Sequence, residues 1–177
     1  MWHAGTPSWR IQQGTSYLVD VALYVRDALA LSVTTEPDIP LLTPPVPVSV
    51  PAGVDRAAVA EQWPDWWADV LTAAEVGHYA GPLRPAVDAA VSAFEGEFAR
   101  YQSTLHDEHV DVGDIVGATE VELGRPARPF RLTITELAVQ GSLCHRITPE
   151  HVLMSTEFIR DAPSRDAVLR RIVAGLA

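Results

Sequence analysis

Six side chains that commonly bind metal ions stand within nine consecutive positions. They belong to the stretch LHDEHVDVGD, from Leu105 to Asp114. Imidazole nitrogens and carboxylate oxygens are ligands that zinc and other divalent metals take in proteins. A metal-dependent reaction is therefore the first chemistry to consider, and its candidate residues are His106, Asp107, Glu108, His109, Asp111 and Asp114.

If this stretch opens with the last turn of a helix, His106 and His109 can share one ion, and Asp111 can fold back as a third ligand. Glu108 would be the general base of a hydrolase that activates metal-bound water. The spacing differs from the helical zinc motif, in which two histidines stand four apart with Glu directly after the first. The alternative is a solvated connection from helix to sheet, with histidines near the negative end of the helix dipole. We favour the connection and keep the site for zinc or another divalent metal as the alternative.

The other catalytic motifs that we considered are incomplete, or lie where the residues around them do not suit the reaction. The tetrapeptide EVGH, Glu75–His78, has the Glu-x-x-His form of di-iron bundles, but Gly77 is expected to end its helix. Cys144 is followed directly by His145, and adjacent side chains on a strand point to opposite faces, so we interpret Cys144 as an inert core thiol. The chain has no glycine-rich phosphate loop and no lysine, which excludes the usual P-loop and Schiff-base chemistry.

Two further groups of side chains could bind a partner or ligand. Trp63, Trp66 and Trp67 recur at helical spacing and are either a docking patch or core; we favour core, because three exposed indoles are costly. Arginine forks bind carboxylate or phosphate, so the arginines of the last third could hold an anion. We expect them instead to pair with acids of the same chain; they are Arg125, Arg128, Arg131, Arg160, Arg165, Arg170 and Arg171.

These side chains must be positioned by regular elements, and the first half of the chain predicts helices. Apolar residues at helical spacing predict a helix over about 16–31 and another over 55–77, which Pro64 should kink or split. A third helix is expected from 82 or 85 to 105. Between the first two, six prolines in 35–55 exclude helix and central strand, which leaves an extended run packed against the body.

The second half changes to an alternating pattern. We expect strands over 114–123, 129–138, 142–147 and 151–155, the last being the weakest, and a closing helix over 164–177. Together these elements predict an α+β fold with three N-terminal helices, a proline-rich extended segment, a small antiparallel β-meander and a C-terminal helix.

The length of 177 residues fits a single compact domain, residues 1–177. We expect residues 1–110 to be its mainly helical part and residues 111–177 to hold the β-meander and the closing helix.

Charge and cysteine usage indicate the compartment and narrow the function classes. The net charge is −10, and residues 1–124 carry five arginines against eighteen acids. Such an acidic surface opposes binding to nucleic acid or anionic membranes, which both require a basic face. The single cysteine and the absence of a secretory pattern at the N-terminus favour the cytoplasm.

No catalytic constellation is complete in this sequence. We therefore expect a non-catalytic acidic protein, without a cofactor, that binds a protein partner or associates with itself. It would act as an adaptor, an assembly factor or a neutralising partner of a basic protein. The alternative is a metal-dependent hydrolase, or another enzyme acting on a small molecule, that uses the His106–His109 region.

Overall fold

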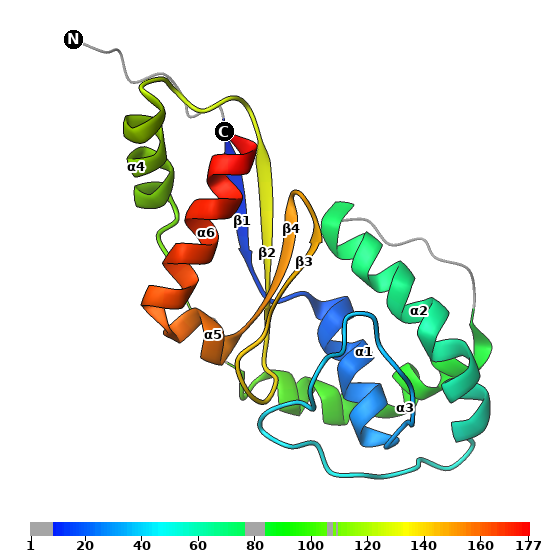
Figure 1. Cartoon of the computed structure of the whole chain (residues 1–177). Coiled ribbons are helices and arrows are strands. Elements are labelled where there is room, and N and C mark those ends of the chain that lie inside the picture. The colour runs from blue at the N-terminus through cyan, green and yellow to red at the C-terminus, as the bar shows by residue number, and fades with distance from the viewer. Residues whose placement is uncertain (1–8, 77–83, 106–107, 109) are drawn as a thin grey trace. The chain divides into compact units, whose positions relative to one another are not determined.

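The computed structural model describes residues 9–76, 84–105, 108 and 110–177. These residues contain six helices and one four-stranded mixed sheet (Figure 1), so the expected α+β class is confirmed. Within the same ranges, no helix combines the length and the apolarity needed to cross a membrane.

The chain divides into two compact units, each of them discontinuous in sequence. The sheet unit consists of Met1–Gly14, Glu108–Glu136 and Ser142–Ala177, and the helical unit of Thr15–Asp107 and Leu137–Gly141. The expectation of one compact domain stays a prediction.

The helical unit is built from α1 (Tyr17–Ala28), α2 (Arg56–Val76) and α3 (Pro85–Gln102), each of which contacts the other two. Helix α1 is the central element, because its residues from Val19 to Ala28 are all buried. Since α1 is enclosed by other elements, its polar side chains must find partners inside the protein.

Helix α2 begins at a capping aspartate and runs through its proline without a break. The Asp55 carboxylate accepts hydrogen bonds from the N–H groups of Ala57 and Ala58, at 3.0 and 3.1 Å. Pro64 lies on the exposed side of this single helix, so of the two expected outcomes, a kink or a split, the split is wrong. The helix stays whole because it is held on both sides of the proline by buried residues, including Val59, Trp63 and Val70.

The sheet unit contains β1 (Arg10–Gly14), β2 (Arg131–Leu137), β3 (Cys144–Thr148) and β4 (His151–Ser155) in the order β1-β2-β4-β3. Strand β1 is parallel to β2, whereas β3 and β4 are antiparallel. The sheet is therefore mixed, and the predicted purely antiparallel meander is wrong. Strand β1 was not predicted, because five residues with one isoleucine give almost no alternation.

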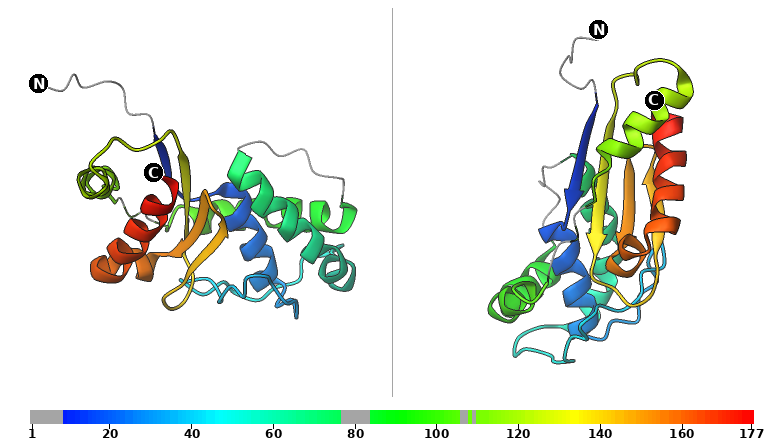
Figure 2. Two further views of the ribbon diagram at one scale, coloured as in Figure 1. Left: turned by 45° about the horizontal axis from the view of Figure 1, so that its top comes forward. Right: turned by 90° about the vertical axis from the view of Figure 1, so that its left-hand side faces the viewer.

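Three helices complete the sheet unit: α4 (Gly113–Leu123), α5 (Thr156–Arg160) and α6 (Ala162–Leu176). Helices α4 and α6 contact each other and pack on one face of the sheet (Figure 2). The shared core joins the helices to side chains from alternate strand positions: Leu132, Ile134, Val152, Met154, Ile115, Val116, Leu169, Ile172 and Val173.

The predicted strand over residues 114–123 is wrong, because this segment forms α4. Its apolar residues alternate in part, but the buried ones are Ile115, Val116 and Thr119, at helical spacing. Val121 and Leu123, which complete the alternating pattern, are exposed. Gly124 ends the helix in the left-handed conformation, with φ of 64°.

Candidate functional site

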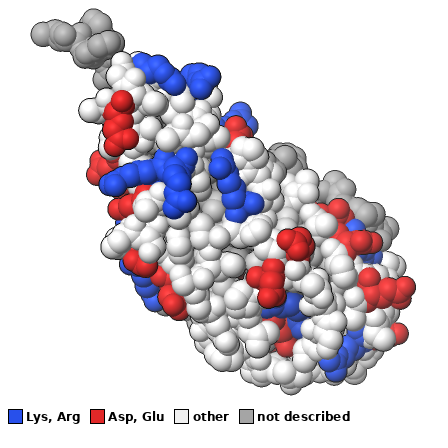
Figure 3. Space-filling view, viewed as in Figure 1, with Lys and Arg blue, Asp and Glu red and all other residues white. Residues whose placement is uncertain are grey.

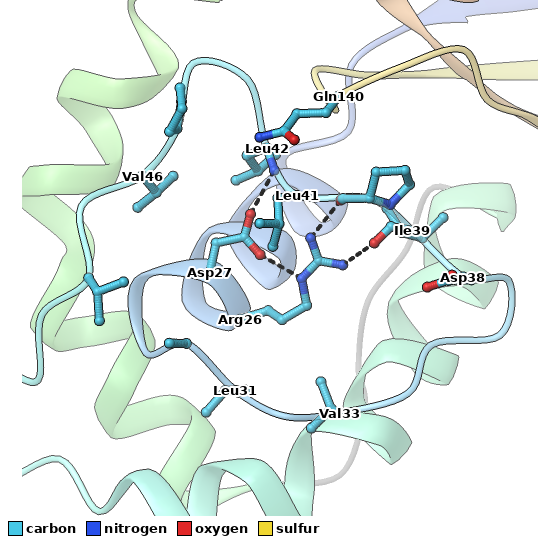
Figure 4. Close-up of a pocket in the computed structure, with 14 residues that line it drawn as sticks. Arg26, Asp27, Leu31, Val33, Asp38, Ile39, Leu41, Leu42, Val46 and Gln140 are labelled. Atoms are coloured by element: carbon cyan, nitrogen blue, oxygen red, sulfur yellow. Dashed lines mark hydrogen bonds and ion pairs between the residues drawn. The ribbon is translucent and has the colours of Figure 1, made fainter.

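The proline-rich segment between α1 and α2 is fixed to the helical unit by a buried ion pair. The Arg26 guanidinium contacts the Asp27 carboxylate at 2.6 Å, and both side chains are almost inaccessible to solvent. Arg26 also donates to the carbonyls of Ile39 and Pro40, at 2.6 and 2.7 Å, and Asp27 accepts the N–H of Leu42 at 2.7 Å. Figure 4 shows this pair enclosed by the segment. The two charged side chains therefore supply hydrogen-bond partners to main-chain groups of a segment that lies outside regular helices and strands.

Main-chain hydrogen bonds attach the same segment at further points. The Thr43 N–H donates to the carbonyl of Ala138, and the Gln140 N–H donates to that of Leu41, both at 2.8 Å. Farther along, the Ser49 N–H donates to the carbonyl of Ala28 at 2.8 Å. The segment is therefore extended and held against the body of its unit, as its composition predicted.

A hollow of about 420 Å³ lies between the end of α1 and the proline-rich segment. Its wall is mostly aliphatic, with Asp38 and Gln140 as further polar side chains beside the Arg26–Asp27 pair. Among the described residues, those that line the hollow include no histidine, cysteine, serine, threonine, tyrosine or lysine. The Arg26–Asp27 pair is committed to main-chain groups, and the aliphatic wall is suited to binding an apolar group.

The segment exposes apolar side chains, of which Leu41, Pro45 and Val48 also line this hollow. Leu41, Val48 and Val50 are 58, 67 and 53% exposed, and the prolines at positions 44, 45 and 47 are exposed as well. We call these six exposed residues the proline–valine face. Exposed apolar side chains gathered on one segment are typical of interaction sites, because folding otherwise buries such groups.

The predicted metal site falls largely outside the described residues, which do not include His106 and His109. The Asp111 carboxylate accepts the Gly113 N–H at 3.0 Å and closes a turn. Helix α3 ends at Gln102, three residues before the stretch begins. The described part of the chain contains no group of three or more residues that could hold a metal ion.

Glu108, the proposed general base of the hydrolase alternative, has structural partners. Its carboxylate receives two hydrogen bonds from the Arg160 guanidinium, at 2.9 and 2.7 Å. Its main-chain N–H donates to the Glu136 carboxylate at 2.9 Å, and its carbonyl accepts from the Gln13 side chain. Glu108 therefore fastens the chain to the sheet unit.

The tryptophans lie in the core, as expected, whereas the cysteine lies at the edge of the core. Trp63, Trp66 and Trp67 are buried, and Trp63 stacks on Trp67 with ring centroids 5.4 Å apart. Cys144 is half-buried on β3, and burial raises the pKa of its thiol above the ordinary value. A raised pKa leaves less thiolate at neutral pH, which is unfavourable for a nucleophile.

Arg160 and Arg165 pair with acids of the same chain, as expected: Arg160 with Glu108 at 2.7 Å and Arg165 with Asp166 at 2.8 Å. Arg125 and Arg128 instead donate to the main-chain oxygen of Ala177. The EVGH motif cannot be assessed: α2 extends to Val76, and Gly77 and His78 lie outside the described residues.

Sequence reasoning missed two buried polar contacts in the sheet unit. Glu136 is 1% exposed, and its carboxylate accepts hydrogen bonds from the Glu108 N–H and, at 3.1 Å, from the Thr156 hydroxyl. The Thr135 hydroxyl lies 2.9 Å from Nε2 of the buried His151. Neither has a local sequence signal, because each contact joins residues at least 16 positions apart in the chain.

Comparison with protein-family models finds no match for this chain, and searches of curated proteins and of solved structures likewise give no significant match.

Proposed function

We propose that this protein acts by binding another protein, without a reaction of its own, and that the proline–valine face is the contact surface. The observation that carries the proposal is the exposure of Leu41, Val48 and Val50 on a segment whose main chain is tied down. A surface that is already fixed loses little conformational entropy when a partner binds. The aliphatic hollow beside it can accept an apolar side chain from that partner.

Charge indicates what kind of partner fits. The helical unit carries four arginines against thirteen acids, a net −9, whereas the sheet unit carries nine arginines against ten acids, a net −1. Figure 3 shows arginines gathered over the sheet unit and acidic side chains prominent on the helical unit. We therefore propose a basic protein as the partner, because complementary charge accelerates and orients association. Adaptor, assembly-factor and neutralising roles all fit this chemistry.

The same acidity argues against nucleic acid and anionic membranes as partners. A reducing cytoplasm suits the lone thiol, and we propose that location.

The test is co-purification from native lysate at physiological salt with wild type and the double variant Leu41→Asp, Val48→Asp. Both positions are exposed, so the variant should keep its helix content in circular dichroism. A carboxylate placed in an apolar contact is desolvated without a partner, so the captured protein should be lost.

The matched control is Val121→Asp, which introduces the same charge at an 82% exposed valine of the sheet unit. It should capture the same basic protein as wild type. The proposal fails if no specific protein is captured, or if the double variant and the control capture the same proteins in equal amounts.

A further inference from the structure

Strand β1 is an outer strand of the sheet in the described part of the chain (Figure 2, right). Its inner side is paired with β2 from Arg10 to Gly14. Natural proteins protect outer strands with proline, with bulges or with several charges. Strand β1 has no proline, pairs with β2 without a break in register, and carries one charge.

The direction of the main-chain groups on β1 follows from one hydrogen bond. The Arg10 N–H donates to the carbonyl of Phe130, at 2.9 Å, and so points toward β2. Main-chain groups alternate in direction along a strand, so those of Gln12 also point toward β2. The N–H and C=O groups of Ile11 and Gln13 therefore point outward, away from the sheet.

The side chains of β1 alternate between the two faces. Ile11 packs against the core that α4 and α6 share with the sheet, and Gln13 lies on the same face, where its amide oxygen accepts the Val110 N–H at 3.2 Å. A groove of about 440 Å³ lies there between Trp9–Gln13 and Val110–Gly113. Arg10 and Gln12 point to the opposite face and are exposed.

We propose that β1 pairs with β1 of a second copy of this chain, antiparallel and centred on Gln12, so that two sheets join into one across a twofold axis. In this register Ile11 faces Gln13 of the second copy, and their outward groups form about four main-chain hydrogen bonds. The two Gln12 residues face each other as a non-hydrogen-bonded pair, about 4.5 Å apart at Cα, with their amides on the exposed face.

The strand RIQQG is complementary to itself in this arrangement. Arg10 lies opposite Gly14, which has no side chain, so the long guanidinium has space and meets no like charge. The two Gln12 amides can each donate to and accept from the other. The groove beside Ile11 and Gln13 leaves room for the side chains of the second strand on that face. A twofold axis also limits the assembly to two copies, because β1 of each copy is then covered by β1 of the other.

The test is a charge swap at Gln12, measured by sedimentation equilibrium. Wild type should be a dimer at high micromolar concentration. Gln12→Glu and Gln12→Arg should each weaken the dimer at least about tenfold, because like charges meet at the axis. An equimolar mixture of the two variants should recover association as a heterodimer. The control is Gln140→Glu, the same change at an exposed glutamine of the helical unit, which should dimerise like wild type.

Three results would overturn the inference: a monomeric wild type, a Gln12→Glu variant that dimerises as well as Gln140→Glu, or a mixture that associates no better than its components. Far-UV circular dichroism of each variant separates a lost dimer from a lost fold. Binding of the basic partner is measured separately on the proline–valine face, so either proposal can fail alone.

Discussion

In the helical unit, Tyr101 shows how burial changes the pKa of a polar side chain. The Tyr101 hydroxyl is buried, and within the described residues it has no hydrogen-bond partner. Burial first, and then the negative charges of Asp20 and Asp27, raise the pKa of Tyr101 well above its ordinary value of 10.0. The folded protein therefore holds this proton at pH values where an unfolded chain loses it.

From this shift we expect stability to fall as the pH rises above 10. Below that pH the tyrosine is protonated in both states and contributes no pH dependence. Above it only the unfolded state loses the proton, and each pH unit costs about 1.4 kcal/mol until Tyr101 also ionises in the folded state. Tyr101→Phe should therefore flatten the alkaline decline of the free energy of unfolding, measured by urea titration at several pH values.

At neutral pH the same variant should change stability by no more than about 0.5 kcal/mol, because the lost hydroxyl made no hydrogen bond. Tyr17→Phe, at a ring that is 54% exposed, is the matched control and should follow the wild-type profile. A Tyr101→Phe profile as steep as that of wild type would refute the account.

At the scale of the element, α2 is informative because its Pro64 lies inside a continuous helix. Proline has no N–H to donate to the carbonyl four residues earlier, and its ring crowds that carbonyl. The helix tolerates this loss because the tryptophans on its inner face bury a large apolar area. Packing, and not local propensity, keeps α2 in one piece.

Replacing Pro64 by Ala should therefore stabilise the protein. The new N–H restores the missing helical hydrogen bond at an exposed position, and we expect a gain of about 1 to 2 kcal/mol after the larger entropy of the unfolded chain is subtracted. Thermal and urea unfolding measure the gain. Pro163→Ala, at the first turn of α6 where no intrahelical bond is missing, is the control. Equal effects at both positions would contradict this explanation.

At the scale of the whole molecule, the metal content of the purified protein tests the predicted metal site. The Asp111 carboxylate closes a turn and the Glu108 carboxylate is bound by Arg160. A metal site would have to displace these partners and still supply second-shell support. Protein purified without a histidine tag should therefore contain far less than one equivalent of zinc, iron or manganese in elemental analysis.

The double variant His106→Ala, His109→Ala extends this measurement. If the stretch is the solvated connection that the sequence predicts, both histidines are exposed, and we expect the free energy of unfolding to stay within about 0.5 kcal/mol of wild type. Stoichiometric metal that disappears in the double variant would instead refute the solvated connection and make the metal-dependent hydrolase the favoured function.

The sequence by itself determined the features that depend on neighbouring residues. Helical spacing of apolar residues predicted helices at α1, α2 and α3, because this periodicity is a property of neighbouring turns. The prolines predicted the extended segment, since each fixes its own φ and lacks its own N–H. The stripe of Trp63, Trp66 and Trp67 was correctly interpreted as core.

The tertiary structure decided what depends on residues far apart in the chain. Strand β1 exists because β2, more than a hundred residues later, pairs with it, and α4 is a helix because α6 and the sheet bury Ile115 and Val116. The candidate site has the same origin. In the sequence, Arg26 and Asp27 resemble ordinary charged residues of a helix. In the structure, the proline-rich segment folds over them and is held there with Leu41, Val48 and Val50 exposed. Local sequence patterns indicate which conformation a few neighbouring residues prefer. Which side chains are buried and which strands pair depends on how whole helices and strands pack.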